Sequence, residues 1–314
     1  MGLRPMKIGV CQPNSRAAAL RLALRSLHAS QRGPLIESLG QLANEPLGAF
    51  DALVVGERGG RVVAATWVQP QPGKTGSLWA PESDSDLSVG DAERLVRHAA
   101  AIADQAGVSM LQLLAESSEP SHAAALRAAG FSDIATLDYL EWRTAQATPT
   151  PEPSASHELS IRVDGADDLP RLKRLVEETY IDTLDCPSLD GLRDVSDTLA
   201  GYRQIGEFDP TLWLRIERNG TDAGVLLLSL HPKTKQLELV YMGVMPAARG
   251  HGIGRIAVRE AQRLARQRGV ERLVLAVDAA NHPAKRLYSQ AGFSAWATRV
   301  VFVRPRRASP SPKR

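Results

Sequence analysis

Apolar residues along the chain recur with two periods, which predict a mixed α/β protein. Apolar positions three and four residues apart indicate amphipathic helices, and short apolar, β-branched runs indicate strands. Residues 73–88 are expected to form a loop, because they are rich in Gly, Ser and acidic residues. The predicted strands are 52–55, 62–68, 110–115, 134–142, 159–163, 212–217, 224–231, 237–244 and 272–277. The predicted helices are two within 17–44, broken at Gly33-Pro34, and single helices at 92–105, 122–129, 169–180, 253–268 and 281–292.

The order of these elements occurs twice. Moving the second half back by the distance between Phe293 and Phe131 aligns LYSQAGF with ALRAAGF, which indicates an internal duplication. Between the halves lies a stretch rich in Pro, Ser, Thr and Ala without an apolar period, and a basic, proline-rich tail ends the chain. The expected organisation is a domain at 1–145, a linker at 146–157, a second domain at 158–305 and a disordered tail at 306–314.

The stretch LELVYMGVMPAARGHGIG (237–254) carries the chemistry of the second half. An apolar strand ends before Pro246, a glycine-rich loop follows, and an amphipathic helix begins at once. Unpaired N–H groups and the helix dipole favour an anion at such a helix start. Glycines allow the backbone to approach the anion, and Arg249 adds a cation. The pattern predicts a phosphate-binding loop.

Two common phosphate loops do not fit this stretch. The Rossmann fingerprint requires a third glycine where Arg255 stands, and a Walker loop ends in Gly-Lys-Ser/Thr, which is absent. The remaining pattern, R-x-x-G-x-G after a strand, resembles the acyl-CoA pyrophosphate loop of the GNAT acetyltransferase superfamily. That superfamily continues with a helix, a strand and N-x-x-A-x-x-L-Y-x-x-x-G-F, and Asn281 to Phe293 matches every one of these letters.

The resemblance implies two tandem GNAT-like domains, each a largely antiparallel central sheet with helices on both faces. It also implies that acetyl-CoA is the cosubstrate. Backbone N–H groups near Val244 would bind the thioester oxygen, the glycine-rich loop would bind pyrophosphate, and Asn281 would bind the pantetheine arm or serve only as a helix cap. The residues expected to bind acetyl-CoA are Met242, Gly243, Val244, Arg249, Gly250, His251, Gly252, Ile253, Gly254 and Asn281.

Two residues are candidates for proton transfer. An amine attacks a thioester only when it is neutral, so a base must remove its proton. Glu238 lies in an apolar strand, and by alternation it is expected to share a face with Val240, Met242 and Val244. A structural pair with Lys235 or an arginine would explain Glu238 equally well. Glutamate at this place resembles mycothiol synthases, which are tandem GNAT proteins.

Tyr288 occupies the position of the family's tyrosine, which would protonate the departing CoA thiolate. A core aromatic is the structural alternative for this residue. Four acidic residues, Asp182, Asp185, Asp190 and Asp194, follow the helix at 169–180, in the region that forms an acceptor wall in the family. They suit a cationic amine, although helix caps and solvated loop positions explain them equally simply.

The first copy lacks the corresponding residues. Leu87 and Ala92 stand where Arg249 and Gly254 stand in the second copy, Leu126 replaces Tyr288, and Glu119 replaces Asn281. The acidic run ESDSD before the helix would repel pyrophosphate. The first domain is therefore expected to be a degenerate, supporting copy.

Composition excludes several functional classes. The formal charge is only +3 and no basic stripe is interleaved with aromatic residues, which argues against nucleic-acid binding. Two distant cysteines suggest a reducing compartment, and neither an apolar signal core nor a membrane-length run is present. His and Cys residues show no metal-ligand spacing. We expect a cytoplasmic protein that binds neither metal, membrane nor nucleic acid, and that is a monomer or a homodimer.

The sequence predicts an acetyl-CoA-dependent N-acetyltransferase whose C-terminal domain catalyses direct attack of an amine on the thioester. Two enzymatic functions differ in the acceptor, which is either a general amine or the aminosugar-thiol conjugate of mycothiol synthases. The pattern is also compatible with a non-catalytic acyl-CoA-binding regulator and with a tandem scaffold for a protein partner. It does not identify the acceptor or the preferred acyl length, because loops build the acceptor pocket.

Overall fold

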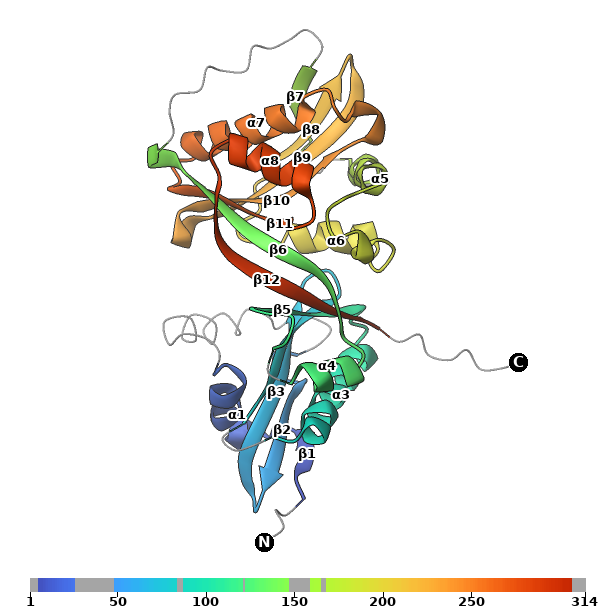
Figure 1. The fold of residues 1–314 in the computed structure, drawn as a ribbon, viewed down its shortest axis with the longest axis vertical. Helices are drawn as coiled ribbons and strands as arrows, with labels where there is room; N and C mark the ends of the chain where they lie inside the picture. The colour runs from blue at the N-terminus through green and yellow to red at the C-terminus, as the bar shows by residue number, and fades with distance from the viewer. Residues whose placement is uncertain are drawn as a thin grey trace, which may run out of the picture. The chain divides into compact units, whose positions relative to one another are not determined.

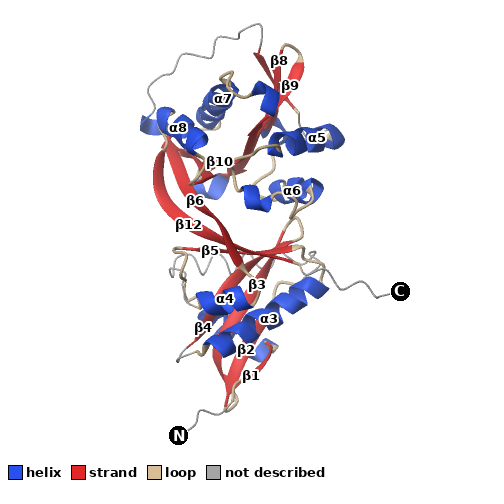
Figure 2. Ribbon diagram, turned by 45° about the vertical axis from the view of Figure 1, so that its right-hand side comes forward, coloured by secondary structure: helices blue, strands red, loops and turns tan. Residues whose placement is uncertain are grey.

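The computed structural model describes residues 5–25, 48–83, 87–120, 122–146, 159–164 and 168–306. The chain forms two compact units, the first from Met1–Ile134 with Val300–Arg314 and the second from Ala135–Arg299. Each unit has a mostly antiparallel sheet with helices on both faces, which confirms the predicted fold class (Figures 1 and 2).

The first unit places its sheet between α1 on one face and α3 and α4 on the other. Leu20 and Ala23 of α1 pack with Trp67, while Leu95 and Ala99 of α3 pack in the core on the opposite face. Its strands, in sheet order, are β1 (Lys7–Val10), β2 (Leu53–Arg58), β3 (Arg61–Gln71), β4 (Thr75–Ser83), β5 (Met110–Ala115) and the end of β12 (Ser294–Pro305); its helices are α1 (Arg16–Ala23), α3 (Val89–Gln105) and α4 (Ala123–Ala128).

The second unit repeats this arrangement. Leu172 and Leu175 of α5 pack on one face of its sheet, and Ala257 and Ala261 of α7 pack on the other, beside α8 (Figure 1). Its strands, in sheet order, are the start of β12, β6 (Ser132–Arg143), β11 (Arg272–Asp278), β10 (Gln236–Val244), β9 (Thr221–His231), β8 (Trp213–Arg218) and β7 (Leu159–Val163); its helices are α5 (Leu169–Tyr180), α6 (Val195–Tyr202), α7 (Ile253–Gln267) and α8 (His282–Gln290).

The expected loop at 73–88 is wrong, because β4 occupies most of it. A turn with positive φ at Gly73 and Lys74 returns the chain along β3. There Trp79 is the register partner of Trp67, and the two rings stack with centroids 6.3 Å apart. Cross-strand aromatic packing therefore outweighs a local composition that favours turns.

The internal repeat is visible in the positions of the elements. Strands β5 and β11 begin at Met110 and Arg272, and β6 and β12 begin at Ser132 and Ser294. Both pairs are separated by the same distance along the chain as Phe131 and Phe293. In both halves this part follows a hairpin, a further strand and a long helix, so β4 is the counterpart of β10.

The compact units differ from the expected boundaries of 1–145 and 158–305, since the two halves exchange their last strands. Strand β6, from the first half of the sequence, pairs with β11 and places Leu140 and Trp142 in the core beneath α7 and α8. The end of β12, from the second half, pairs with β5 and places Phe302 in the core beneath α3. The predicted helix beyond Gly33-Pro34, the linker after Gln146 and the tail after Arg306 lie outside the described residues.

The exchange of strands predicts that two core substitutions each destabilise the unit from the other half of the sequence. Phe302→Ala should lower the free energy of unfolding by about 3–5 kcal/mol and increase amide hydrogen exchange in α3 and β5. Leu140→Ala should cost about 2–5 kcal/mol and increase exchange in α7 and β11 instead. Hydrogen-exchange mass spectrometry distinguishes the two patterns. Faster amide exchange in α7 and β11 for Phe302→Ala, or in α3 and β5 for Leu140→Ala, would contradict the swapped positions of β6 and β12.

Candidate active site

The candidate site begins where β10 and β11 part. The two strands pair in parallel at only three positions, and the last of these joins Glu238 to Val274. Beyond it β10 continues along β9 as far as Val244, and β11 continues along β6 as far as Asp278. One edge of β10 after Glu238 is therefore not paired with β11, and its backbone N–H and C=O groups can bond to a ligand.

A β-bulge at Val240 determines which side chains point to each face. The register of β10 with β9 shifts between Leu239 and Tyr241. Before the bulge Leu239 packs toward α7, and after it Met242 packs there, while Tyr241 packs toward α5 and α6. The prediction that Glu238 shares a face with Met242 and Val244 is therefore wrong, because the extra residue of a bulge interrupts alternation. Glu238 lies on the face that α5 and α6 cover.

The loop after β10 leaves the start of α7 open to an anion. A single 3-10 turn (Pro246–Ala248) leads to Gly250 and Gly252, which both have φ of 77°. Gly252 is the N-cap of α7, and no side chain caps this helix. A Cβ atom at either glycine would meet no heavy atom within 4 Å. The N–H groups of the first turn thus have room for a phosphate.

The next two predicted residues can contribute only their backbone. Ile253 is almost fully buried in the core beneath α7. At Gly254 a Cβ atom would lie 3.0 Å from a methyl carbon of Leu287, so this glycine allows α7 and α8 to pack closely. Gly243 is also a packing position, since a Cβ there would collide with Thr179 on α5.

Arg249 is directed away from the loop that it was expected to serve. Its guanidinium donates to the carbonyl oxygens of Thr179 (3.2 Å), Ile181 (2.6 Å) and Asp182 (3.2 Å), and its Nε donates to that of Val244 (3.1 Å). These carbonyls include the C-terminal end of α5, which carries partial negative charge. Arg249 therefore joins the phosphate loop to the end of α5, and its contact with pyrophosphate stays a prediction.

Two further residues that are predicted to bind acetyl-CoA, His251 and Asn281, form local hydrogen bonds. His251 is exposed, and its Nδ1–H donates to the Arg249 carbonyl at 2.8 Å, which leaves Nε2 as the other polar atom of the ring. Asn281 caps α8 by accepting from the N–H of Ala284 at 3.2 Å. The Asn281 side chain also bonds to Asp185. Neither role excludes a contact with acetyl-CoA.

Tyr288 lies in the core of the second unit. Its ring packs against Phe293 with centroids 5.6 Å apart, and only 5% of the residue is exposed. Burial, and then the carboxylate of Asp185, raises the pKa of Tyr288. The hydroxyl is therefore protonated at neutral pH, which is the form that donates a proton. Among the described residues it has no hydrogen-bond partner.

Glu238 has a histidine partner that the sequence analysis did not anticipate. Its Oε2 lies 2.8 Å from Nε2 of His231 on the neighbouring strand β9, and a third of its side chain is exposed. Lys235, the expected structural partner, pairs with Glu271 at 2.9 Å. A pairing of Glu238 with Lys235 is therefore wrong, and the carboxylate is accessible next to an imidazole.

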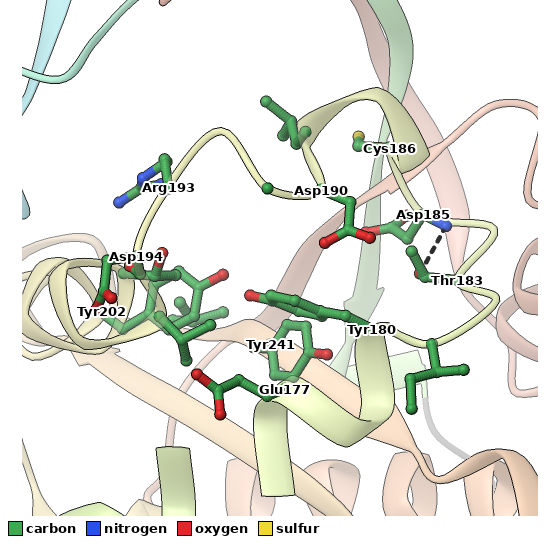
Figure 3. A pocket seen from close by; sticks show the side chains of 16 residues that line it. Glu177, Tyr180, Thr183, Asp185, Cys186, Asp190, Arg193, Asp194, Tyr202 and Tyr241 are labelled. Atoms are coloured by element: carbon green, nitrogen blue, oxygen red, sulfur yellow. Dashed lines mark hydrogen bonds between the residues drawn. The ribbon is translucent and has the colours of Figure 1, made fainter. Parts of the chain in front are cut away.

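A pocket of about 400 Å³ opens on the same face of β10 (Figure 3). Helix α5, the loop after it and α6 form its walls, and Val240 and Tyr241 contribute from β10. Three acids of the expected acceptor wall, Asp185, Asp190 and Asp194, line this pocket and Asp182 does not, so the binding of an acceptor here stays a prediction. Asp194 is also the N-cap of α6. The lining residues are Glu177, Tyr180, Ile181, Thr183, Asp185, Cys186, Leu189, Asp190, Gly191, Arg193, Asp194, Val195, Thr198, Tyr202, Val240 and Tyr241.

The lining residues that sequence reasoning did not single out include Tyr241 and Arg193. Tyr241 was hidden because the bulge reverses the face that its position predicts. Arg193 was overlooked among the acids around it, although a lone arginine in an acidic run is itself a signal.

In the described part of the chain, no cluster of three or more His, Cys, Asp or Glu residues could hold a metal ion. No described helix is both long and apolar enough to cross a bilayer.

Comparison with known proteins agrees with this geometry. Residues 176–293, which include the parted strands, the open helix start and Tyr288, match the model of the acetyltransferase (GNAT) family. This part of the chain belongs to the GNAT family. The enzyme class predicted from the sequence, an N-acetyltransferase, is thereby confirmed, and acetyl-CoA is the cosubstrate that this family uses in general.

Relatives and solved structures extend the likeness beyond the GNAT domain. A mycothiol acetyltransferase of Thermobispora bispora is 27% identical over 93% of this chain and 97% of its own length. One from Thermomonospora curvata is 36% identical, over 31% of this chain and 33% of its own. A GCN5-related N-acetyltransferase from Sphaerobacter thermophilus covers 98% of both chains with a TM-score of 0.61 and 18% identity.

A tandem GNAT protein from the clavulanic acid biosynthesis pathway shows the same overall fold. It covers 98% of this chain and 100% of its own, with a TM-score of 0.51 and 16% identity. The tandem arrangement predicted from the repeat is therefore also found among solved structures.

The contacts of Arg249 make a prediction about stability. Arg249→Gln removes the guanidinium from up to four carbonyl oxygens, and we expect it to lower the free energy of unfolding by about 1–3 kcal/mol. Arg259→Gln is the matched control, since Arg259 is exposed on α7 and makes no hydrogen bond or ion pair among the described residues. Thermal or urea unfolding measures both. Equal stability of the two variants would show that the Arg249 contacts contribute nothing.

Proposed function

We propose that this protein is an acetyl-CoA-dependent N-acetyltransferase whose second unit transfers the acetyl group to an amine by direct attack. The observation that carries the proposal is the place where β10 leaves β11. The free edge of β10, the uncapped start of α7 and the pocket on α5 and α6 all adjoin this one strand.

In the proposed reaction the acceptor amine must lose a proton before it attacks the thioester carbon. Glu238 is the proposed base, because its carboxylate is accessible on the face of β10 that also contributes to the pocket. Proton transfer by a positioned side chain contributes about 10²–10⁴-fold to rate. The His231 partner fixes the orientation of the carboxylate. The new C–N bond then forms as the C–S bond breaks, and CoA leaves as a thiolate.

Two groups are proposed to stabilise the negative charges that arise. Backbone N–H groups of Met242 and Val244, which alternate with the groups that bond to β9 and so lie on the free edge of β10, would donate to the thioester oxygen as it gains charge. Tyr288 would give its proton to the CoA thiolate, since burial keeps its hydroxyl protonated. For this transfer the Tyr288 hydroxyl must be reached from the side of α8 on which acetyl-CoA binds.

The chemistry of Cys186 supports direct attack without a covalent acyl-enzyme. This thiol is the cysteine side chain among the residues that line the pocket. Burial, with the carboxylates of Asp185 and Asp278, raises its pKa to about 12. A thiol with such a pKa is protonated at neutral pH and is a poor nucleophile.

The first unit is proposed to bind no acetyl-CoA. Its strands β4 and β5 also pair in parallel at only three positions, so the parting of the strands is repeated. The start of α3, however, is closed by Ser88, whose side chain accepts from the N–H of Asp91 at 3.1 Å. The Asp91 carboxylate lies in the same first turn, where it would repel a phosphate.

Acetylation of an aminosugar-thiol conjugate is the second candidate. It is supported by the similarity to the mycothiol acetyltransferase of Thermobispora bispora along nearly the whole of both chains. Glu238 and Tyr288 would have the same roles in that reaction. The two candidates differ only in the acceptor.

The first test is a calorimetric titration of the full chain with acetyl-CoA, for which we expect one site. Gly250→Ala should weaken binding about tenfold or more, because a methyl group at φ of 77° strains the loop and occupies the space where phosphate approaches. Gly269→Ala is the matched control, since this glycine also has positive φ but lies at the other end of α7.

Either of two titration results would overturn a part of the proposal. Two sites per chain would show that the first unit also binds acetyl-CoA. No binding would remove the enzymatic function and favour a scaffold role.

A second test addresses the proposed proton transfers. Glu238→Gln and Tyr288→Phe should bind acetyl-CoA normally and lower kcat by about 10²–10⁴-fold and tenfold or more, respectively. Release of free CoA with an active acceptor measures turnover. Glu271→Gln is the control, since this exposed carboxylate pairs with Lys235 away from the pocket. Wild-type rates in the first two variants would return both residues to structural roles.

A further inference from the structure

The acceptor pocket contains an arginine without a partner. Arg193 lies in its wall, two residues before α6, and its Nε atom is buried without a hydrogen-bond partner. Within the described residues none of its nitrogen atoms forms a hydrogen bond or an ion pair. A half-buried guanidinium left unpaired is costly, and a carboxylate is the group that its planar fork matches best.

The tyrosines around Arg193 do not satisfy it. Tyr241 lies between Tyr180, whose ring meets it edge-on at 5.7 Å, and Tyr202, whose ring stacks on it at 6.1 Å. Burial raises the pKa of Tyr180, and Arg193 only partly opposes this. The hydroxyl of Tyr241 is bonded to Thr179 at 2.6 Å. All three phenols are neutral, so none of them neutralises the guanidinium.

The opposite side of the pocket attracts a cation. In Figure 3, Asp185 and Asp190 lie on the right and Arg193 on the left, with the ring of Tyr180 between them. Asp185 is accessible from the pocket, although protein surrounds its other sides. Burial raises its pKa, and the neighbouring carboxylate of Asp278 adds to this rise. A cation next to Asp185 would favour its charged form and so oppose both effects.

The Asp185 side is also the side of the reaction. One oxygen of Asp185 accepts from the N–H of Asp278, the last residue of β11, at 2.9 Å. Its side chain also bonds to Asn281 at the start of α8, and its charge acts on Tyr288 in that helix. An ammonium group held by Asp185 therefore lies toward the groups proposed to act on the thioester, whereas Arg193 lies toward α6.

The remaining acids do not compensate Arg193. Asp194 caps α6 by accepting from the N–H of Ser196 at 2.7 Å, and it pairs with Lys173 at 3.4 Å. Asp278 accepts from the N–H groups of Cys186 and Ala280 and is buried. The loop is held by these bonds even though Asp182 and Cys186 have positive φ, so the two ends of the pocket are positioned in advance.

We propose that the acceptor is an amino carboxylate, an amine that also carries a carboxylate, with its ammonium group at Asp185 and Asp190 and its carboxylate at Arg193. This inference rests on the proposed N-acetyltransferase function and identifies the substrate class of that site. The tyrosine rings between the two charged ends accommodate the part of the molecule that joins them, through apolar and cation–π contacts. An acceptor without a carboxylate leaves Arg193 unpaired.

The test compares matched acceptors that differ only in the carboxylate. Lysine is compared with cadaverine and phenylalanine with phenethylamine, within a panel of the common amino acids, using the full chain saturated with acetyl-CoA. The expected kcat/KM is about tenfold or more higher for the carboxylate-bearing member of an active pair. Arg193→Gln should abolish this preference through KM, and Arg193→Lys should retain part of it.

The companion variant tests the other end of the pocket. Asp185→Asn should raise KM for both members of a pair, because the ammonium group is common to them. Acetyl-CoA affinity should be unchanged in all three variants, which shows that the fold is intact. Binding of the same amino acids to the complex with CoA, measured by calorimetry, gives a readout without turnover.

Three results would overturn the inference. The decarboxylated amines could be used as well as the amino acids, the preference could survive Arg193→Gln, or no amino acid in the panel could bind the CoA complex at millimolar concentration. Failure of the proposed function is distinct, because the protein would then bind no acetyl-CoA or acetylate no amine at all.

Discussion

The arrangement of the second unit depends on the short parallel pairing of β10 with β11, which covers only three positions. Each strand has a full partner on its other side, β9 or β6, so both are held firmly while they separate after Glu238 and Val274. A sheet interior normally satisfies every backbone group, and this separation leaves a polar edge inside a rigid framework. The bulge at Val240 adds a second effect, since it directs Tyr241 toward α5 and α6. One strand thereby offers an unpaired edge and, through Val240 and Tyr241, part of the wall of a pocket, which are the places proposed for the cosubstrate and the acceptor.

The two units show that this framework and its chemistry are separable. Both have the short parallel pairing, and both follow it with a long amphipathic helix. They differ at the first turn of that helix, where no side chain caps α7 at Gly252, whereas the Ser88 side chain accepts from the N–H of Asp91 in α3. A capping side chain takes one of the donors that a phosphate would otherwise use. The repeat therefore preserves the architecture more closely than the residues at the start of the long helix.

Arginines connect the parts of the candidate site in two different ways. Arg249 donates four hydrogen bonds to carbonyl oxygens of β10 and of the end of α5, so the loop that precedes α7 is joined to the end of α5. Arg193, in the same wall, has no partner among the described residues. A guanidinium that is bonded to several carbonyl oxygens contributes to the scaffold, whereas a half-buried one without a partner supports the proposal that an anion binds there. The distinction cannot be made from residue type, because both residues are arginines in loops.

Local periodicity and turn chemistry are sufficient to predict the order of most helices and strands, the repeat, the glycine-rich helix start and the helix cap at Asn281. The motifs of 237–293 also pointed to the family whose model matches residues 176–293. The exchange of β6 and β12, the strand β4, the partner of Glu238 and the direction of Arg249 are apparent only in the folded chain. These depend on pairing between distant segments and on a bulge that reverses the faces of β10, and neither leaves a periodic signal in the sequence.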